Sequence, residues 1–286
     1  LVMAAERLAD HDPARAGPRQ RLWQIRAGHV ILATGAHEQP LQFGNNDLPG
    51  VMLASAGLMF ARQYGALPGR RVIITTANDY GHEVARGMIE AGAEIAAVVD
   101  SRPSAPASDQ FSVIAGGTIL QARGRKRVSA VDIAAKGRTS TVACDAVLMS
   151  GCWQPTLHLH SHSGGRSRYD EEAGCFVPAN SLPNVTSVGG CKGDFTLSAC
   201  LEAGHAAGNF AATNAGYPSS TECPKASTPE IGDIAQNVEF AETFSFPRKG
   251  KAFVDYQNDV TTADIDLAVR EGFVSVEHLK RYTTTG

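Results

Sequence analysis

Three apolar runs in the sequence end in glycine, at Gly35, Gly151 and Gly190. A short continuous apolar run is typical of a parallel strand that is covered on both faces. In open α/β sheets, ligands bind outside the carboxyl ends of the strands, where glycine lets the backbone approach the ligand. The sequence therefore predicts a cofactor-binding edge, and the residues expected to line it are Thr34, Gly35, Gly189, Gly190, Lys192, Thr196 and Leu197.

The strand-helix-strand pattern of residues 71–100 lacks the glycine-rich loop that would hold a dinucleotide phosphate. A dinucleotide fold needs Gly-x-Gly-x-x-Gly after its first strand, to seat the pyrophosphate on a helix N-terminus. Here the loop reads Thr75-Thr-Ala-Asn-Asp-Tyr-Gly81, so only Gly81 remains, and Asp79 would repel a phosphate. Asp100 ends the next strand, where a ribose-binding carboxylate would lie. We favour a Rossmann-like module that has lost its ligand over one that binds a dinucleotide.

Histidines offer two further candidate sites. His158, His160 and His162 alternate, and on a strand they would share one face, as metal ligands could. No carboxylate or cysteine is arranged around them, so we expect a surface loop and no metal site. His37 beside Glu38 could be an acid/base pair, but we favour a solvated loop with a local hydrogen bond.

Composition limits the class of protein. The chain has 286 residues, enough for two compact domains, and its net charge of -3 argues against nucleic-acid binding. We expect no secretory leader, and no run of about 18 apolar residues that could span a membrane is found in the sequence. None of the six cysteines forms a C-x-x-C pair, so we expect free thiols in a cytoplasmic protein. The sequence begins within an amphipathic stretch and stops at Thr-Thr-Thr-Gly286, so we expect it to be a fragment of a larger subunit.

The periodicity predicts an α/β chain followed by a small helical tail. Buried strands are expected at 30–33, 71–76, 93–100, 145–151 and 185–190, helices over 53–64, 79–92 and 197–214, and a β-meander at 114–120, 128–134 and 139–143. In the tail, Thr261 and Asp264 are spaced as in a capping box, and Gly272 ends the helix that they start. Ser275 can cap a second helix, so the tail predicts a helix-turn-helix.

The glycine-ended segments resemble those of flavoproteins with two dinucleotide-binding domains. The segments that carry the likeness are Ala33-Thr-Gly35, Asp145–Pro155 and Leu182–Gly193. The implied fold is α/β, Rossmann-like and similar to the disulfide reductases, with an incomplete first domain and a small C-terminal helical module. The expected domains are 1–50 with 178–216, an inserted second domain 51–177 with the β-meander, a linker 217–250 and a helical module 251–286.

The tail is similar to the α subunit of heterotetrameric sarcosine oxidase. The likeness rests on His278-Leu-Lys-Arg-Tyr-Thr-Thr and extends to His37–Pro40, Asn46–Ala56 and Gly151–Ser163. It implies oxidative demethylation of sarcosine to glycine with O2 and tetrahydrofolate, forming hydrogen peroxide. It implies NAD in the site that related reductases use for FAD, and FAD and FMN elsewhere in the parent complex. The implied partners are the β, γ and δ subunits, and the folate-binding domain would lie beyond Gly286.

The resemblance also limits what this chain does. Amine oxidation resembles β-subunit chemistry, so no catalytic residue is assigned here, and the fragment alone is expected to be inactive and to bind NAD weakly. Related dehydrogenase subunits hold a [2Fe–2S] cluster on four thiolates, but the tail from Phe253 onward has no cysteine, so no cluster is expected there. Two alternatives stay open: a subunit of a related opine, proline or cyanide-forming dehydrogenase, and a non-catalytic assembly module.

Overall fold

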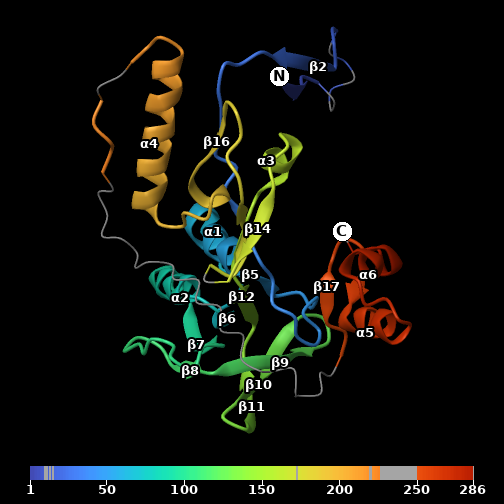
Figure 1. Ribbon diagram of the computed structural model, residues 1–286. Coiled ribbons are helices and arrows are strands. Elements are labelled where there is room, and N and C mark those ends of the chain that lie inside the picture. The colour runs from blue at the N-terminus through green and yellow to red at the C-terminus, as the bar shows by residue number, and fades with distance from the viewer. Residues whose placement is uncertain are drawn as a thin grey trace. The chain divides into compact units, whose positions relative to one another are not determined.

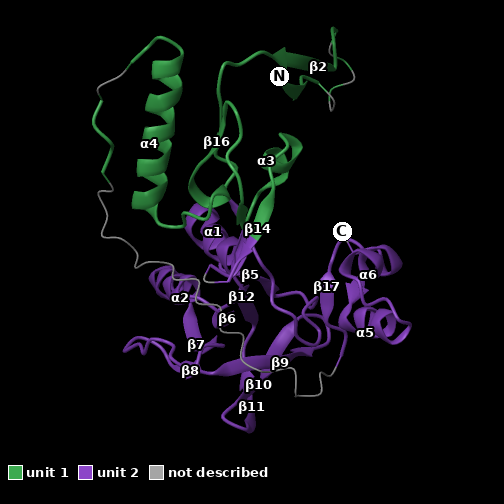
Figure 2. Cartoon of the chain, in the orientation of Figure 1, with its two compact units in different colours: residues 1–35, 155–168, 177–229 green, residues 36–154, 169–176, 230–286 purple. Residues whose placement is uncertain are grey.

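The computed structural model describes residues 1–9, 12, 14, 16–171, 173–218, 221–225 and 250–285 (Figure 1). The chain divides into two compact units (Figure 2). Unit 1 comprises Leu1–Gly35, Pro155–Arg168 and Val177–Pro229, and unit 2 comprises Ala36–Gln154, Tyr169–Phe176 and Glu230–Gly286. Most of the expected linker, residues 226–249, lies outside the described residues.

A parallel five-stranded sheet forms the centre of unit 2. Its strands lie in the order β5-β12-β6-β7-β8, and their bounds are Val51–Leu53, Ala146–Ser150, Arg71–Thr76, Glu94–Asp100 and Val113–Ala115. Every residue of β12 is buried, as expected of a strand covered on both faces. The carboxyl ends of all five strands therefore lie at one edge of the sheet, where α/β proteins bind their ligands.

Alternation along β6 sends its side chains into two separate cores. Val72 and Ile74 pack with α1 (Ala54–Tyr64) and α2 (Tyr80–Glu90). Ile73 packs into the second core, with residues of the three-stranded meander. All three side chains are fully buried, and each contributes about 1.5–3 kcal/mol of hydrophobic stabilisation. Unit 2 is therefore layered, with helices on one face of the sheet and the meander on the other.

The β-meander forms as predicted, except at its start. Its strands are β9 (Gly117–Gly124), β10 (Val128–Ala135) and β11 (Arg138–Ala143), with β10 in the middle. The predicted strand 114–120 is two strands, because β8 pairs in parallel with β7 and ends before Gly116. Gly116 has φ +65°, a left-handed conformation that suits glycine, and the turn there sends the chain out of the sheet into the meander.

The predicted helix-turn-helix tail is also present, in unit 2. β17 (Phe253–Asp255) and β18 (Val260–Thr261) pair ahead of α5 (Thr262–Arg270) and α6 (Val276–Thr283). Thr261 and Asp264 form the expected capping box. Asn46, in an earlier loop, binds β17 in both directions, since its Nδ2 donates to the Phe253 carbonyl and its Oδ1 accepts from the Phe253 N–H, each at 2.9 Å. These bonds fix the start of the tail.

Unit 1 is made of short pairs of strands and one long helix. β1 (Val2–Arg7) pairs with β2 (Gln20–Ile25), and all six residues of β2 are exposed. β3 (Val30–Leu32) pairs in parallel with β16 (Val185–Ser187). A 3₁₀ turn η1 (Gly189–Cys191) leads from β16 toward α4 (Leu197–Asn214).

Five short elements complete the described chain. β4 (Ala36–Glu38) pairs with β13 (Trp153–Pro155), and α3 (His158–His162) follows. β14 (Ser167–Asp170) and β15 (Cys175–Pro178) pair with each other. Among the described residues, no helix has the length and apolarity needed to cross a bilayer.

Candidate functional site

The predicted cofactor-binding residues lie in unit 1, after two strands that end at the same edge. β3 and β16 are parallel, with Val30 opposite Val185 and Leu32 opposite Ser187. Thr34 and Gly35 follow the end of β3, and the other predicted residues follow the end of β16. The register therefore places both groups at the carboxyl edge of this strand pair. We call the seven predicted residues the glycine edge.

Two glycines of this edge need their glycine conformation. Gly35 has φ +71° and Gly189 has φ +65°, both in the left-handed region that other residues rarely adopt. A Cβ added to Gly35 would meet no atom within 4 Å, so the space in front of its backbone is open. The turn is held by Thr156, whose N–H donates to the Gly35 carbonyl at 2.9 Å and whose carbonyl accepts from Thr34 Oγ1 at 2.8 Å.

The N-terminus of α4 supplies the polar end of the glycine edge. Thr196 is the N-cap, and its Oγ1 accepts a hydrogen bond from the Ala199 N–H at 3.2 Å. Leu197, the first helical residue, is exposed. The unpaired N–H groups at a helix N-terminus and the helix dipole favour an anion, which is how such a helix holds a phosphate group. This end of α4 can therefore attract an anionic group of a ligand.

Lys192 lies in the segment between η1 and α4. Its side chain is 54% exposed, and its Nζ lies 3.7 Å from Asp194 Oδ2, which is a loose ion pair. A lysine ammonium held this loosely keeps donors for a ligand anion. Together with the two left-handed glycines and the α4 N-terminus, it gives an arrangement of donors that fits the pyrophosphate of a dinucleotide.

The corresponding loop in unit 2 is filled by the protein's own groups. Thr76 Oγ1 donates to the Asn78 carbonyl at 2.9 Å, and Asn78 Oδ1 accepts from the Tyr80 N–H at 3.0 Å. A Cβ on Gly81 would lie 2.4 Å from the Cβ of Thr76, so helix and strand approach closely here. This glycine therefore serves packing between α2 and β6.

Asp100, the expected ribose-binding position, is already saturated with donors. Its Oδ1 accepts from the N–H and Nε of Arg102, at 2.9 and 3.0 Å, and its Oδ2 accepts from an Arg102 Nη and from His82 Nε2, at 2.7 and 2.8 Å. An ionised carboxylate has about four acceptor positions, so none is left for ribose hydroxyls. Arg102 also binds Asp79 at 2.7 Å. These contacts favour the interpretation that this module has lost its ligand.

The ionisation of this network follows from its contacts. Burial raises the pKa of Asp100, but the hydrogen bonds from His82 and Arg102 outweigh it, and the pKa lies below its ordinary value. Burial lowers the pKa of Arg102, and its bonds to Asp100 and Asp79 outweigh that effect, so its pKa is raised. The network is therefore a charged structural cluster at the carboxyl end of β7.

Glu38 differs from the sequence expectation. It is buried, at 6% exposed, rather than in a solvated loop, and its partner is Ser55 rather than His37. Its Oε2 accepts from the Ser55 N–H at 2.9 Å and from Ser55 Oγ at 2.6 Å, which caps the start of α1. Burial raises the pKa of Glu38, and the hydrogen bonds from Ser55 only partly offset this. Local sequence gave no signal of this partner, which lies 17 residues away.

The histidine triplet is also placed differently. His158, His160 and His162 lie on the helix α3 rather than in a loop, and residues two apart on a helix do not share a face. His160 is buried, and its Nε2 faces the Arg166 carbonyl at 3.3 Å. Within the part of the chain that the structure describes, no group of three or more His, Cys, Asp or Glu is arranged to hold a metal ion.

The six cysteines are free thiols, as expected. Burial, followed by the charge of Asp145, raises the pKa of Cys144 to about 11. Burial is also the first cause that raises the pKa of Cys175 to about 11. Thiols with such pKa values stay protonated at neutral pH and are poor nucleophiles and ligands.

Comparison with known proteins gives consistent matches. The sarcosine oxidase A3 domain family matches residues 249–286. Sarcosine oxidase subunit alpha of Rhizobium meliloti (strain 1021) is 40% identical over 99% of this chain and 29% of its own length. The subunit of the same name from Corynebacterium sp. (strain P-1) is 33% identical over 99% of this chain and 31% of its own length. The chain thus spans about a third of these relatives.

A solved structure shares the fold. The L-proline dehydrogenase from P. horikoshii matches with a TM-score of 0.61 and 20% identity, over 90% of this chain and 48% of its own. At this identity the likeness concerns the fold alone. It confirms the predicted α/β, Rossmann-like fold class with a parallel sheet.

Proposed function

We propose that this chain, which is a homologue of the sarcosine oxidase α subunits, contributes a dinucleotide-binding scaffold to a sarcosine oxidase complex. The predicted resemblance is confirmed over almost the whole chain. The reaction of the complex would be oxidation of the N-methyl group of sarcosine to give glycine, with O2 as the oxidant, hydrogen peroxide as its product and tetrahydrofolate accepting the one-carbon unit. That reaction acts on a CH–NH group of the donor.

The cofactor of this chain would be NAD, held at the glycine edge. The observation that carries this is the joint position of Gly35, Gly189 and the α4 N-terminus at one strand edge. The glycine backbones would approach the pyrophosphate, and the α4 N-terminus and Lys192 would offset its charge. Thr34 would fix the turn beside Gly35, Thr196 would orient the first helical turn, and Leu197 would cover an apolar part of the ligand.

The rest of the proposal concerns the complex. FAD and FMN would be bound at the β subunit and its interface with the α subunit, and the β, γ and δ subunits would be the partners. We assign no catalytic residue and no iron–sulfur cluster to this chain, and we place the complex in the cytoplasm. The filled second module supports a scaffolding role for unit 2. The division into residues 1–50 with 178–216, 51–177, 217–250 and 251–286 remains part of the proposal.

A chimera tests the function. Residues 1–286 would replace the matching segment of the Rhizobium meliloti subunit, which would be expressed with the other subunits of that enzyme. We expect an assembled complex that contains NAD and forms hydrogen peroxide when sarcosine is added. An assembled chimera that oxidises an opine or proline but not sarcosine would contradict the proposal.

Variants of the same chimera test the cofactor site. Thr196→Ala and Lys192→Gln should lower the affinity for NAD, because they remove a helix cap and a charge at the glycine edge. Lys280→Gln in α6 removes a charge outside this edge and serves as the matched control. NAD content is measured after assembly is verified. Unchanged NAD content in both variants would show that the site lies elsewhere.

A further inference from the structure

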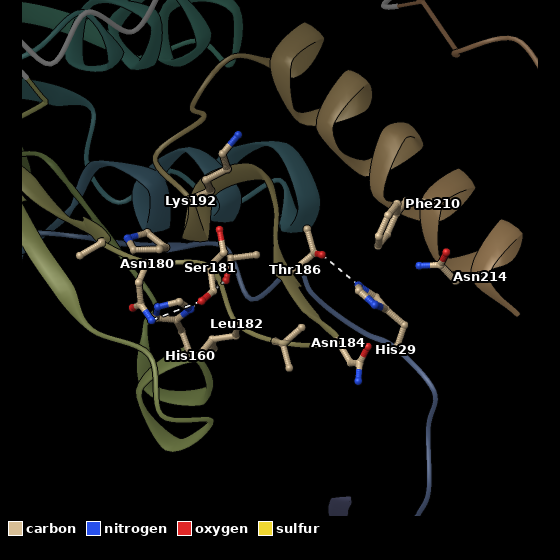
Figure 3. A pocket seen from close by; sticks show the side chains of 14 residues that line it. His29, His160, Asn180, Ser181, Leu182, Asn184, Thr186, Lys192, Phe210 and Asn214 are labelled. Carbon is tan, nitrogen blue, oxygen red and sulfur yellow. Dashed lines mark hydrogen bonds between the residues drawn. The ribbon is translucent and has the colours of Figure 1, made fainter.

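A second hollow in unit 1 is separate from most of the glycine edge. It has a volume of about 530 Å³, within the range of small-molecule sites. It is lined by His29 before β3, by residues 178–187 around β16, by His160 of α3 and by the last turns of α4 (Figure 3). Of the seven glycine-edge residues, only Lys192 lines it.

The charge of this pocket favours an anion. None of the described residues that line it carries a carboxylate, although the chain as a whole is acidic. Lys192 lines one end and supplies a cationic group, whose Nζ lies 3.7 Å from Oδ2 of Asp194, a residue outside the lining. Hydroxyl and amide side chains lie along the wall, and they can donate hydrogen bonds: Asn180, Ser181, Asn184, Thr186 and Ser187. A carboxylate or phosphate group would find complementary donors here.

The other end of the pocket is aromatic. His29 and Phe210 meet edge to face, with ring centroids 5.5 Å apart and an interplanar angle of 75°. His29 Nε2 lies 2.9 Å from Thr186 Oγ1, and this hydrogen bond fixes the imidazole ring (Figure 3). Phe210 is 56% exposed and therefore presents free ring surface. An aromatic group of a ligand can pack against it, since aromatic pairs prefer offset or edge-to-face contact.

We propose that this pocket binds an elongated aromatic anion, with its ring against Phe210 and His29 and its charged end near Lys192. Phe210 lies in the last turns of α4 and Lys192 precedes its first turn, so a ligand that reaches both needs a spacer between its ring and its charge. The inference goes beyond the proposed dinucleotide scaffold and does not depend on it, because Phe210 and His29 are not part of the glycine edge. Because Lys192 belongs to both sites, the dinucleotide and the aromatic anion would compete for its charge.

The test uses the 286-residue chain and 4-phenylbutyrate as the probe, with 4-phenylbutanamide as its uncharged counterpart. Backbone ¹H–¹⁵N NMR titration should show saturable shifts at His29, Thr186 and Phe210. Phe210→Leu and Lys192→Gln should each weaken binding about two- to tenfold, because each removes one end of the complementarity. Lys280→Gln in the tail should leave it unchanged. The amide should bind more weakly than the acid.

Several results would overturn the inference. Equal affinity for the acid and the amide would remove the role of charge, and shifts centred on unit 2 would place binding elsewhere. If Phe210→Leu and Lys192→Gln both bound the probe with wild-type affinity, the inference would also be wrong. The NAD content of Phe210→Leu in the assembled chimera separates this test from that of the proposed function, because this variant should retain NAD as the wild type does.

Discussion

At the scale of single residues, the informative side chains are buried acids whose partners come from elsewhere in the chain. Glu38 caps α1 from 17 residues away, and Asp100 is held by Arg102 and by His82 of α2. The sequence marked Asp100 as a position of interest, because it ends a strand. It could not show that the carboxylate is satisfied internally, since that depends on side-chain rotamers and on the packing of α2. The left-handed turns at Gly35 and Gly189 relate more directly to residue type, because glycine adopts a positive φ without steric cost.

Glu38→Gln should make the stability of unit 2 less dependent on pH. The pKa of Glu38 is raised in the folded protein, so its contribution is fully present below the unfolded pKa of about 4.3. The contribution is lost as the pH rises through the folded pKa, because the buried carboxyl must then ionise. The stability of the variant relative to the wild type should therefore increase as the pH rises above the unfolded pKa, as measured by hydrogen exchange of the α1 amides.

The matched control for this prediction is Glu277→Gln, on the exposed surface of α6. It should follow the pH profile of the wild type. If the Glu38→Gln profile also follows it, then the burial of Glu38 does not control its ionisation in the way described.

Arg102→Ala should destabilise unit 2 strongly. It removes the guanidinium that binds both Asp100 and Asp79 and leaves the fully buried Asp100 without its charge partner. Removing one partner of a buried ion pair costs about 3–5 kcal/mol. Urea unfolding of the variant, monitored at unit 2, measures the loss. Arg86→Ala, at an exposed pair with Glu83, should cost far less, about 1 kcal/mol or below. Similar losses in the two variants would contradict this account.

At the scale of elements, buried strands and capped helices were predictable, and strand boundaries within the sheet were not. β6, β12 and α4 follow from apolar runs and small-residue helical patterns. The division between β8 and β9 depends on pairing partners, since one lies beside β7 and the other beside β10. The local pattern of apolar residues does not show which neighbouring strand a strand will pair with. The same limit applies to His158–His162, where the sequence suggested a surface loop and the structure has the helix α3.

Asn46→Ala should loosen the helical tail without unfolding the central sheet. The variant loses both hydrogen bonds to Phe253 and leaves those backbone groups unpaired. A buried group left unsatisfied costs about 1–3 kcal/mol, and here the cost falls on the attachment of β17. We expect faster hydrogen exchange in residues 253–283 and unchanged exchange in β6 and β12. Gln257→Ala, at an exposed turn, should change neither. Unchanged exchange in the tail of Asn46→Ala would show that the tail is held by other contacts.

At the scale of the whole molecule, stability is divided unequally between the two units. Both buried hydrophobic clusters lie in unit 2. Unit 1 exposes large apolar side chains, among them Met3, Leu22, Trp23 and Phe210. Length and composition indicated two compact parts, but they could not show which part holds the hydrophobic cores.

Unit 2 should therefore resist opening better than unit 1 in the 286-residue chain. Amides of β6 and β12 should exchange near the global unfolding limit, and those of β2 and β3 should exchange orders of magnitude faster, because few buried contacts hold them. Native-state hydrogen exchange with mass spectrometry measures both in one sample. Equal protection in the two units would mean that unit 1 has a core of its own.

The pairing of β3 with β16 joins residues that are about 155 positions apart, and the whole of residues 36–154 lies between them. Closing so long a loop has an entropic cost that is reduced once the intervening chain is already compact. The local contacts of the β6-α2-β7 segment can form first, and the glycine edge then comes together late. We therefore expect the glycine edge to form late in folding, so that a ligand of the proposed site would bind only after the slowest folding phase.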